Sequence, residues 1–527
     1  MFQALLIVLF VPAVDAEVTA DVIIRGATIH DGSGKPGFRG DVALKGERIV
    51  GVGQFAVSGQ PEIIDGTGLI VAPGFIDLHN HSDMSAQRPR ILRPAIAELE
   101  YRKNLNFLMQ GCTTIVTGNC GFGPYDVAEF FRQLDKNKIG TNVIHQIPHN
   151  DLRQHVMGNA NRPPTDEEMA RMLQLVEKNM KDGAWGLSTG LFYTPGSYAD
   201  KDEIVALAKV VSRYGGFYAS HMRNEGPNLL PSIHETIEVG RRAKLPVHIS
   251  HFKAFGPKAW GKAADAIALV RDARKKGLRV TVDQYPYTAS STSLAADVIP
   301  QVYREGSHKD LIARFDDPEL GPKIRQAIQS ALKDMDDGKR IRIAQFPANP
   351  KWQGKDLAQL AKEQGKNPVD IVLDIERRGG CQIVAFSMTE EDVRLIMKQP
   401  FVATASDGAT KIPDATVPHP RNYGTFPRKI GYYALQERVL PVEQAIRSAT
   451  GLPADILKLP QRGYLKPGYF ADVVVFDPKT FRDTATFDKP HQYATGVRYL
   501  FVNGVATIKD GKYTGALAGK ALRHSSR

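Results

Sequence analysis

Two histidines stand two residues apart at the end of an apolar run, where His79 and His81 close the segment 74–81. Successive side chains of a β-strand point to opposite faces, so residues two apart share a face and both imidazoles can reach one ion. In parallel βα architectures, the carboxyl ends of the strands carry the functional groups. A lone His-x-His pair is weak evidence, but the preceding strand and the further candidate ligands favour a metal site here.

Two more histidines, His221 and His251, each end an apolar run and each follow a serine. The same position at a strand end predicts that both imidazoles face the same metal site as the first pair. His248 lies three residues before His251 and points to the opposite face of an alternating strand, so we expect it to be structural. The alternative is that His221 and His251 are ordinary hydrogen-bonded core histidines.

A thiolate is the candidate for the anionic ligand that divalent ions favour. Some binuclear hydrolases bridge two ions with a carboxylated lysine, but the strand expected at 142–148 contains no lysine. Cys120 lies just beyond the end of another expected strand, where a thiolate can bridge two metal ions. Cys112, eight residues earlier, lies about 26 Å away along an extended strand and at the wrong end of it. The alternative for Cys120 is a merely buried thiol.

A single carboxylate ends the last expected strand, where Asp407 stands in Ser-Asp-Gly. Beside a metal site, such a carboxylate can bind the ion, accept the proton of an attacking water and pass it to a leaving amine. Without the histidines, the same tripeptide would indicate only a turn.

Eight apolar runs alternate with helical patterns such as 166–181 and 201–214. The alternation predicts a parallel α/β architecture, and eight strands favour a closed TIM-like (β/α)8 barrel over an open sheet. About 120 residues separate two of these strands, far more than one βα unit needs, so we expect an insertion at 290–346. The expected strands are 74–79, 113–117, 142–146, 185–188, 216–221, 246–251, 279–283 and 402–406.

Both chain ends contain short apolar runs separated by glycines, a pattern typical of short β-strands. We expect the two ends to pair into one small β-sandwich. The expected organisation follows the chain: the N-terminal half of the β-sandwich at 17–71, the barrel at 72–289, the insertion at 290–346, the barrel again at 347–450, and the C-terminal half of the β-sandwich with the C-terminal tail at 451–527.

The 527-residue chain has the composition of a globular protein with two or three domains, 42% hydrophobic and 24% charged. Its net charge of +11 comes from short basic clusters without interleaved aromatic residues, which argues against nucleic-acid binding. Residues 1–16 resemble a signal peptide, too short for a stable membrane span, and predict a periplasmic or secreted protein, or a cytoplasmic one if the segment is not a signal. Three cysteines exclude a full disulfide framework.

Several motifs together resemble the N-acyl-D-amino-acid deacylase (D-aminoacylase) branch of the amidohydrolase superfamily. The resemblance runs from about residue 21 to the C-terminus and implies hydrolysis of N-acyl-D-amino acids to a carboxylic acid and a free D-amino acid. It also implies zinc, with Cys120, His221 and His251 holding a tight ion and His79, His81 and Asp407 forming a second, weaker position. The motifs lie at 118–122, 186–193, 220–225, 285–287, 406–408, 419–426 and 468–477.

The resemblance also implies substrate-binding residues, namely Lys253 and members of the segment 285–291, from which we take Tyr285, Tyr287 and Ser291. Arg421 and Arg428 are further candidates for a carboxylate clamp, because guanidinium matches a carboxylate with two hydrogen bonds, although either could instead form a structural ion pair. We expect Arg223 and Glu225 to pair with each other. The chain departs from the pattern after His251, where Phe252 stands in place of an expected second histidine.

Two other functions fit the same residues. The scissile group could be a cyclic amide, as in hydantoinase or dihydroorotase-like enzymes, or a D-peptide bond. A protein of another class would be an exported binding protein that keeps the pocket without turnover. Six polar residues at strand ends argue for catalysis. The preferred side chain, the acyl group and the oligomeric state are not set by these motifs.

Overall fold

A computed structural model describes residues 17–84 and 94–525, and the expected leader at 1–16 lies outside this range. All eight expected strands are present, with ends that differ by a residue or two, and every pair among them is parallel. We call them the strand ring: β8 (Phe75–Asp77), β9 (Cys112–Thr117), β10 (Asn142–His145), β12 (Gly186–Gly190), β13 (Phe217–His221), β14 (Val247–Ile249), β15 (Val280–Gln284) and β19 (Val402–Thr404).

Hydrogen bonds close the ring at both junctions between its two sheets. The strands pair in the orders β8 to β10 and β12 to β19. The short β11 (Ile147–Pro148) continues β10 and pairs with β12, and Trp185 N donates to His145 O at 3.0 Å. At the other junction, Asn80 bridges Gly408 in parallel and Asp407 N donates to His79 O at 2.8 Å. The ends of the first and last strands are thereby held side by side.

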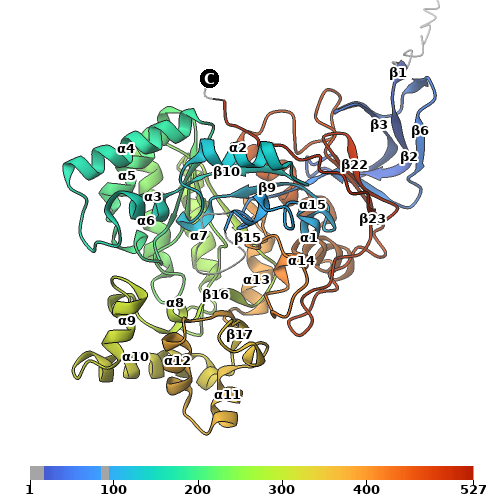
Figure 1. The fold of residues 1–527 in the computed structure, drawn as a ribbon. Coiled ribbons are helices and arrows are strands. Elements are labelled where there is room, and N and C mark those ends of the chain that lie inside the picture. The colour runs from blue at the N-terminus through green and yellow to red at the C-terminus, as the bar shows by residue number, and fades with distance from the viewer. Residues whose placement is uncertain (1–16, 85–93, 526–527) are drawn as a thin grey trace, which may run out of the picture.

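Amphipathic helices cover the outside of the strand ring, as Figure 1 shows. Helix α4 begins with a capping box, in which Thr165 and Glu168 satisfy each other's backbone N–H groups. Its Val176 packs in one buried cluster with Leu187 of the ring. The helices are α1 (Leu105–Leu108), α2 (Val127–Asn137), α3 (His149–Met157), α4 (Asp166–Lys181), α5 (Lys201–Arg213), α6 (Leu229–Ala243), α7 (Ala263–Lys275), α13 (Glu390–Met397), α14 (Arg421–Pro427), a π-helical stretch (Arg428–Gln436), α15 (Val442–Ala449) and α16 (Gly451–Leu457).

A lobe with its own hydrophobic core interrupts the ring between β15 and β19 (Figure 1). It is longer than the expected insertion at 290–346, because its third strand and the last members of its buried cluster lie at 381–385, inside the segment assigned to the barrel at 347–450. We call residues 290–385 the insertion. It contains β16 (Ser290–Ser293), α8 (Leu294–Val298), α9 (His308–Phe315), α10 (Leu320–Asp334), β17 (Ile341–Gln345), α11 (Leu357–Gln364), α12 (Pro368–Arg377) and β18 (Gln382–Ala385).

The two chain ends share one nine-stranded mixed sheet, joined where β7 and β20 pair antiparallel. The expected pairing of both ends is present, but β7 extends the N-terminal half past residue 71. One buried cluster takes residues from both ends, including Ile24 and Val473. The mixed sheet contains β2 (Val22–Ile29), β3 (Phe38–Lys45), β4 (Arg48–Gly53), β6 (Glu62–Asp65), β7 (Ile70–Pro73), β20 (Val473–Phe476), β21 (Val497–Val502), β22 (Val505–Lys509) and β23 (Lys512–Tyr513), while β1 (Glu17–Thr19) pairs with β5 (Ala56–Ser58).

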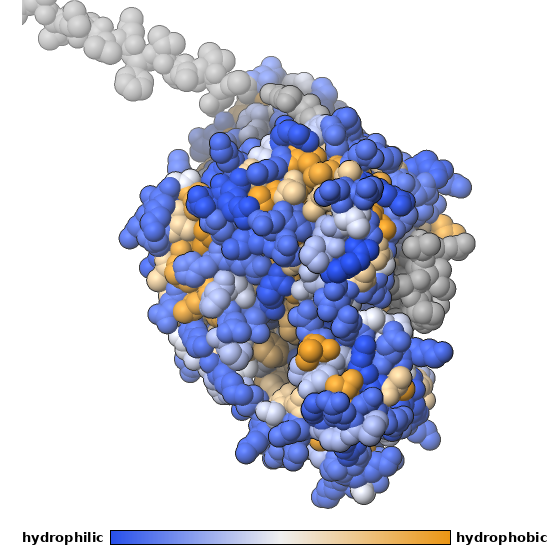
Figure 2. Space-filling view, turned by 90° about the vertical axis from the view of Figure 1, so that its left-hand side faces the viewer, coloured by the Kyte–Doolittle hydropathy of each residue, from blue (hydrophilic) through white to orange (hydrophobic). Residues whose placement is uncertain are grey.

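The outer surface is mainly hydrophilic on the face drawn in Figure 2, where hydrophobic residues gather only in small groups. Within the described residues, none of the helices combines the length and apolar character needed to cross a membrane.

A buried ion pair at the start of β20, where Asp472 also accepts from Asn142 Nδ2 of β10 at 3.4 Å, ties the mixed sheet to the strand ring and gives a stability prediction. Arg462 pairs with Asp472, with only 3% and 4% of their side chains exposed, and Asp472 also accepts from Asn503 N. Replacing Arg462 with Met leaves the buried carboxylate of Asp472 without its partner and should destabilise the protein by about 3 kcal/mol. The guanidinium denaturation midpoint measures this change. Arg498→Met removes an exposed pair with Asp510 and should cost less than about 1 kcal/mol. Equal effects would contradict the assignment.

Candidate metal centre

Two histidines and a carboxylate meet where β8 and β19 end. His79 Nε2 lies 3.3 Å from His81 Nε2, and Asp407 Oδ1 lies 3.0 Å from His81 Nε2 and 3.4 Å from His79 Nε2. The two strands are adjacent in the ring, which explains how residues more than 300 positions apart share one site. His79, His81 and Asp407 therefore offer three ligand atoms to one point.

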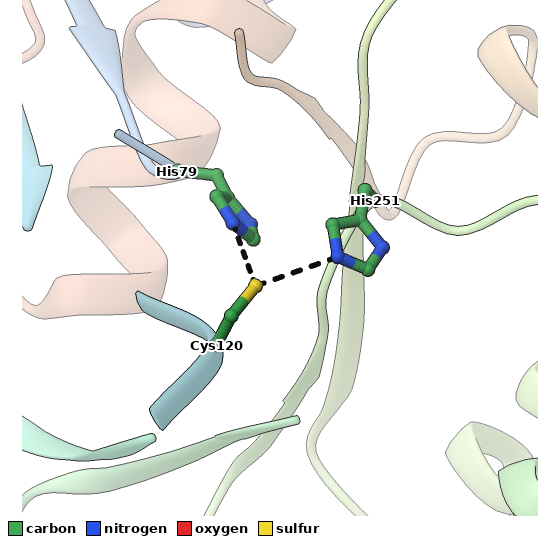
Figure 3. A group of neighbouring side chains, drawn as sticks. All are labelled: His79, Cys120 and His251. Atoms are coloured by element: carbon green, nitrogen blue, oxygen red, sulfur yellow. Dashed lines mark hydrogen bonds between the residues drawn. The ribbon is translucent and has the colours of Figure 1, made fainter. Parts of the chain in front are cut away.

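A second group forms around the thiol of Cys120, as Figure 3 shows. Its Sγ lies 3.3 Å from His79 Nε2 and 3.5 Å from His251 Nε2. His251 Nε2 in turn lies 2.8 Å from His221 Nδ1. The structure thus brings together all six candidate ligands, with His79 common to both groups.

The donor atoms fit a soft or borderline divalent cation. Two imidazole nitrogens that face each other at 2.8 Å can share at most one proton, and the Cys120 sulfur faces the same space. A cation satisfies all of these lone pairs at once. Thiolate and imidazole are the ligands that zinc takes in proteins, so the residues present fit zinc.

At three of the six residues the backbone has a positive φ angle, the left-handed conformation that residues other than glycine rarely adopt. Their φ angles are +54° at Cys120, +35° at His251 and +51° at Asp407. Such conformations cost free energy and persist where the surroundings impose them, commonly at functional sites. The chain therefore accepts local strain at three separate strand ends to aim these side chains inward.

A buried carboxylate that sequence reasoning missed orients two of the imidazoles. Asp283 Oδ2 lies 2.8 Å from His248 Nε2 and 3.5 Å from His79 Nδ1, and its Oδ1 accepts from His251 N at 2.7 Å. A carboxylate on one ring nitrogen fixes the tautomer and leaves the other nitrogen free for an ion. His248 has the structural place expected for it. The position of Asp283 at the end of an expected strand was the available signal.

Glu225 lies behind His251 as Asp283 lies behind His79. The expected ion pair between Arg223 and Glu225 is wrong. Glu225 Oε1 lies 2.8 Å from His251 Nδ1 and its Oε2 lies 2.6 Å from Lys253 Nζ. Arg223 instead pairs with Glu235 at 3.0 Å. Neighbours in sequence beyond a strand end need not face each other, because the chain turns away from the sheet there.

Electrostatic contacts keep the thiol and the carboxylate anionic. Burial alone would raise the pKa of Cys120, but the facing His79, His221 and His251 hold that pKa well below its usual value. Burial also opposes ionisation of Asp407, while Arg421, at 2.7 Å, and His79 hold its pKa well below the usual range. Both groups are therefore suited to a cation.

A cavity of about 790 Å³ opens onto the centre, and four of the six expected substrate-binding residues line it: Lys253, Tyr285, Ser291 and Arg421. Tyr287 and Arg428 do not line it. Arg428 instead pairs with Asp483 at 3.0 Å, donates to Pro286 O and lies over the Tyr287 ring. Of the two expected clamp arginines, Arg428 thus has the structural role. Residues of the insertion form one wall of the cavity.

Comparison with known proteins places this geometry in context. Residues 62–512 match the amidohydrolase family. The chain is 35% identical to a D-aminoacylase of Alcaligenes xylosoxydans xylosoxydans, over 96% of this chain and 98% of that one. A solved D-aminoacylase with a binuclear metal centre is 32% identical with a TM-score of 0.81, and covers 96% of this chain and 100% of its own. An N-acyl-D-glutamate deacylase of Bordetella bronchiseptica, solved with zinc and a phosphonate inhibitor, is 30% identical with a TM-score of 0.80 over the same shares.

Removing the thiol tests the donor set. Cys120→Ala should lower the zinc content of the purified protein by at least about half, because structural and catalytic zinc need their full ligand set, as measured by elemental analysis. Cys112→Ala is the matched control, since Cys112 is a buried thiol at the opposite end of β9. Unchanged zinc in Cys120→Ala would refute the assignment.

Asp283→Asn tests the orienting carboxylate. It should weaken zinc binding by about 10- to 100-fold, since partners behind the ligands tune metal affinity on that scale. Competition with a chromogenic chelator measures this change. Asp77→Asn is the control, because Asp77 is equally buried and bonds Ser406 and Asn80 but no imidazole ring. Equal losses in both variants would mean that any buried charge loss disturbs the site.

Proposed function

The chain belongs to the amidohydrolase family, and we propose that it hydrolyses the amide bond of N-acyl-D-amino acids, giving a carboxylic acid and a free D-amino acid. The observation that carries this proposal is the convergence of Cys120, His221 and His251 with His79, His81 and Asp407 at one point, beside a cavity that all of them except His79 line. The deacylases that the chain matches over nearly its whole length support the same reaction.

The two groups of donors would hold metal ions of different affinity. Cys120, His221 and His251 would hold the tighter zinc ion, and His79, His81 and Asp407 a second, weaker one. Zinc bound there would polarise the substrate carbonyl and make water acidic enough to attack near neutral pH. The chain's own residues supply the orientation and the proton transfers.

Asp407 is the group placed to move the proton. Its carboxylate lies at the cavity wall, ionised and held by Arg421 Nη1 at 2.7 Å. It accepts one proton from the attacking water as the oxygen bonds to the carbonyl carbon. When the C–N bond breaks, it returns that proton to the departing nitrogen, so the base is regenerated and the products are an acid and an amine.

Three residues in the cavity suit the substrate carboxylate. The Tyr285 ring centroid lies 4.8 Å from Arg421 Cζ and 5.9 Å from Lys253 Nζ. Its hydroxyl is buried and has no hydrogen-bond partner among the described residues, so it is free to donate to a ligand. Arg421 and Lys253 lie over the face of the same ring, so the hydroxyl stands in a cavity wall that carries cationic side chains.

The fold class and the location of the protein complete the proposal. The closed strand ring with helices outside supports a TIM-like (β/α)8 barrel, and the mixed sheet shared by both ends supports the small β-sandwich. We propose that residues 1–16 direct the chain to the periplasm or the outside of the cell.

A substrate panel with an Asp407 variant tests the reaction. Wild type with added zinc should hydrolyse N-acetyl-D-amino acids and leave the L-enantiomers largely intact. Asp407→Asn should keep the zinc of the tighter site and lose about 10²- to 10⁴-fold in kcat, the usual contribution of a general acid–base group. Asp414→Asn is the control, because Asp414 is a half-exposed carboxylate of the same loop outside the cavity.

The same panel separates the other functions. Opening of a hydantoin ring with untouched N-acetyl-D-amino acids would indicate a cyclic-amide hydrolase, and cleavage of D-dipeptides alone would indicate a D-peptidase. Metal-free protein without turnover of any substrate would indicate a binding protein.

A further inference from the structure

The charged side chains that line the cavity are mostly paired within the chain. Each of these pairs satisfies its charges before any ligand arrives, which removes the cost of leaving a charge unpaired in a poorly solvated wall. The pairs are Lys253 with Glu225, Arg421 with Asp407, Arg223 with Glu235 and His308 with Glu376.

Asp297 is the exception among the acidic residues. It lies on α8 of the insertion and lines the cavity, next to the buried side chain of Val298. It makes no hydrogen bond or ion pair with any described residue. Burial in the cavity wall, where the side chain keeps partial exposure, is the cause of a pKa raised to about 7, and no cation among the described residues offsets the cost of its charge. A positively charged ligand would supply the counter-charge that the described residues do not.

Two cations in the cavity wall also lack an ion-pair partner among the described residues, Arg304 and Lys411. Arg304 has other contacts, because its Nε donates to Ile299 O at 2.9 Å and its guanidinium lies 5.6 Å from the Phe192 ring centroid. Lys411 lies beyond β19, on the Asp407 side of the cavity. Neither contributes to the pKa shift of Asp297. Asp297 is therefore a separate anionic point on the insertion's wall.

We propose that Asp297 forms a distal subsite for a cationic group, an ammonium or guanidinium, on a substrate whose amide bond lies at the metal centre. The inference rests on the proposed function and adds a substrate class to it. The cavity, at about 790 Å³, is near the upper end of the range of about 300–1,000 Å³ for small-molecule sites. It leaves room for a substrate that extends from the metal centre to the insertion.

The cation could belong to the side chain of the D-amino acid or to the acyl group, and two matched substrate pairs distinguish these sources. The first pair is N-acetyl-D-arginine and its neutral analogue N-acetyl-D-citrulline. The second pair is 6-aminohexanoyl-D-alanine and heptanoyl-D-alanine. The kcat/KM of each is measured with wild type and Asp297→Asn at about pH 8.5, where carboxylates near pKa 7 are ionised.

In at least one pair, wild type should prefer the cationic member, and Asp297→Asn should reduce that preference by about 10- to 100-fold, mainly through KM. The kcat/KM for N-acetyl-D-methionine should differ by less than about twofold between wild type and Asp297→Asn, because this substrate has no cationic group for Asp297 to bind. Glu305→Gln is the matched control, because Glu305 is a carboxylate of the insertion that does not line the cavity. Unchanged preferences in both pairs, or equal losses for charged and neutral members, overturn the inference.

Calorimetry separates this inference from the proposed reaction. If wild type hydrolyses none of these compounds, the proposed function fails, and binding of the same pairs to wild type and Asp297→Asn decides the subsite alone. Tighter binding of a cationic member that disappears in Asp297→Asn supports it. Preferred hydrolysis of N-acetyl-D-glutamate, unaffected by Asp297→Asn, overturns it.

Discussion

The structure depends on bringing mutually repelling donor atoms to one point. The nitrogen lone pairs of His79, His221 and His251 and the sulfur of Cys120 converge at 2.8–3.5 Å, and all four side chains are buried. Such a set is unfavourable by itself and becomes favourable around a cation, so that metal affinity and folding free energy are linked. Everything that holds these atoms in place must resist their separation. The parallel ring provides this resistance through backbone hydrogen bonds beside the ligands, such as Asp407 N to His79 O and Leu191 N to His221 O.

The carboxylates behind the ligands fix the orientation of the individual imidazole side chains. Asp283 contacts His79, His248 and the backbone of His251, and therefore links three strands of the ring through one side chain. Glu225 contacts His251 and Lys253 in the same way. Each carboxylate occupies the nitrogen that faces away from the centre. The direction of an imidazole is thus decided by a residue that need not touch the ion.

The difference between what the sequence predicted and what it missed follows from the range of the forces involved. Strand periodicity depends on neighbouring residues, so the eight strands and the histidines at their ends could be located from local pattern alone. The partners of Glu225 and Arg428 depend on which loops meet above the ring, and no local pattern encodes that meeting. The positive φ angles of Cys120, His251 and Asp407 likewise result from tertiary constraint. The segment expected as the insertion, 290–346, ends before β18, because a four-residue strand gives no local sign of the sheet that it joins.

The distribution of charge over the cavity separates groups that hold the centre from groups that face a ligand. Near the donor atoms, Arg421 and Lys253 each have a carboxylate partner, so the geometry of Asp407 and His251 is maintained without substrate. On the wall formed by the insertion, Asp297 has no ion-pair partner among the described residues, although His308 there pairs with Glu376. A wall that is not needed to support the donor atoms can tolerate an unsatisfied group at a modest cost in stability. The insertion is therefore the region of the fold where a recognition residue can be placed without disturbing the chemistry.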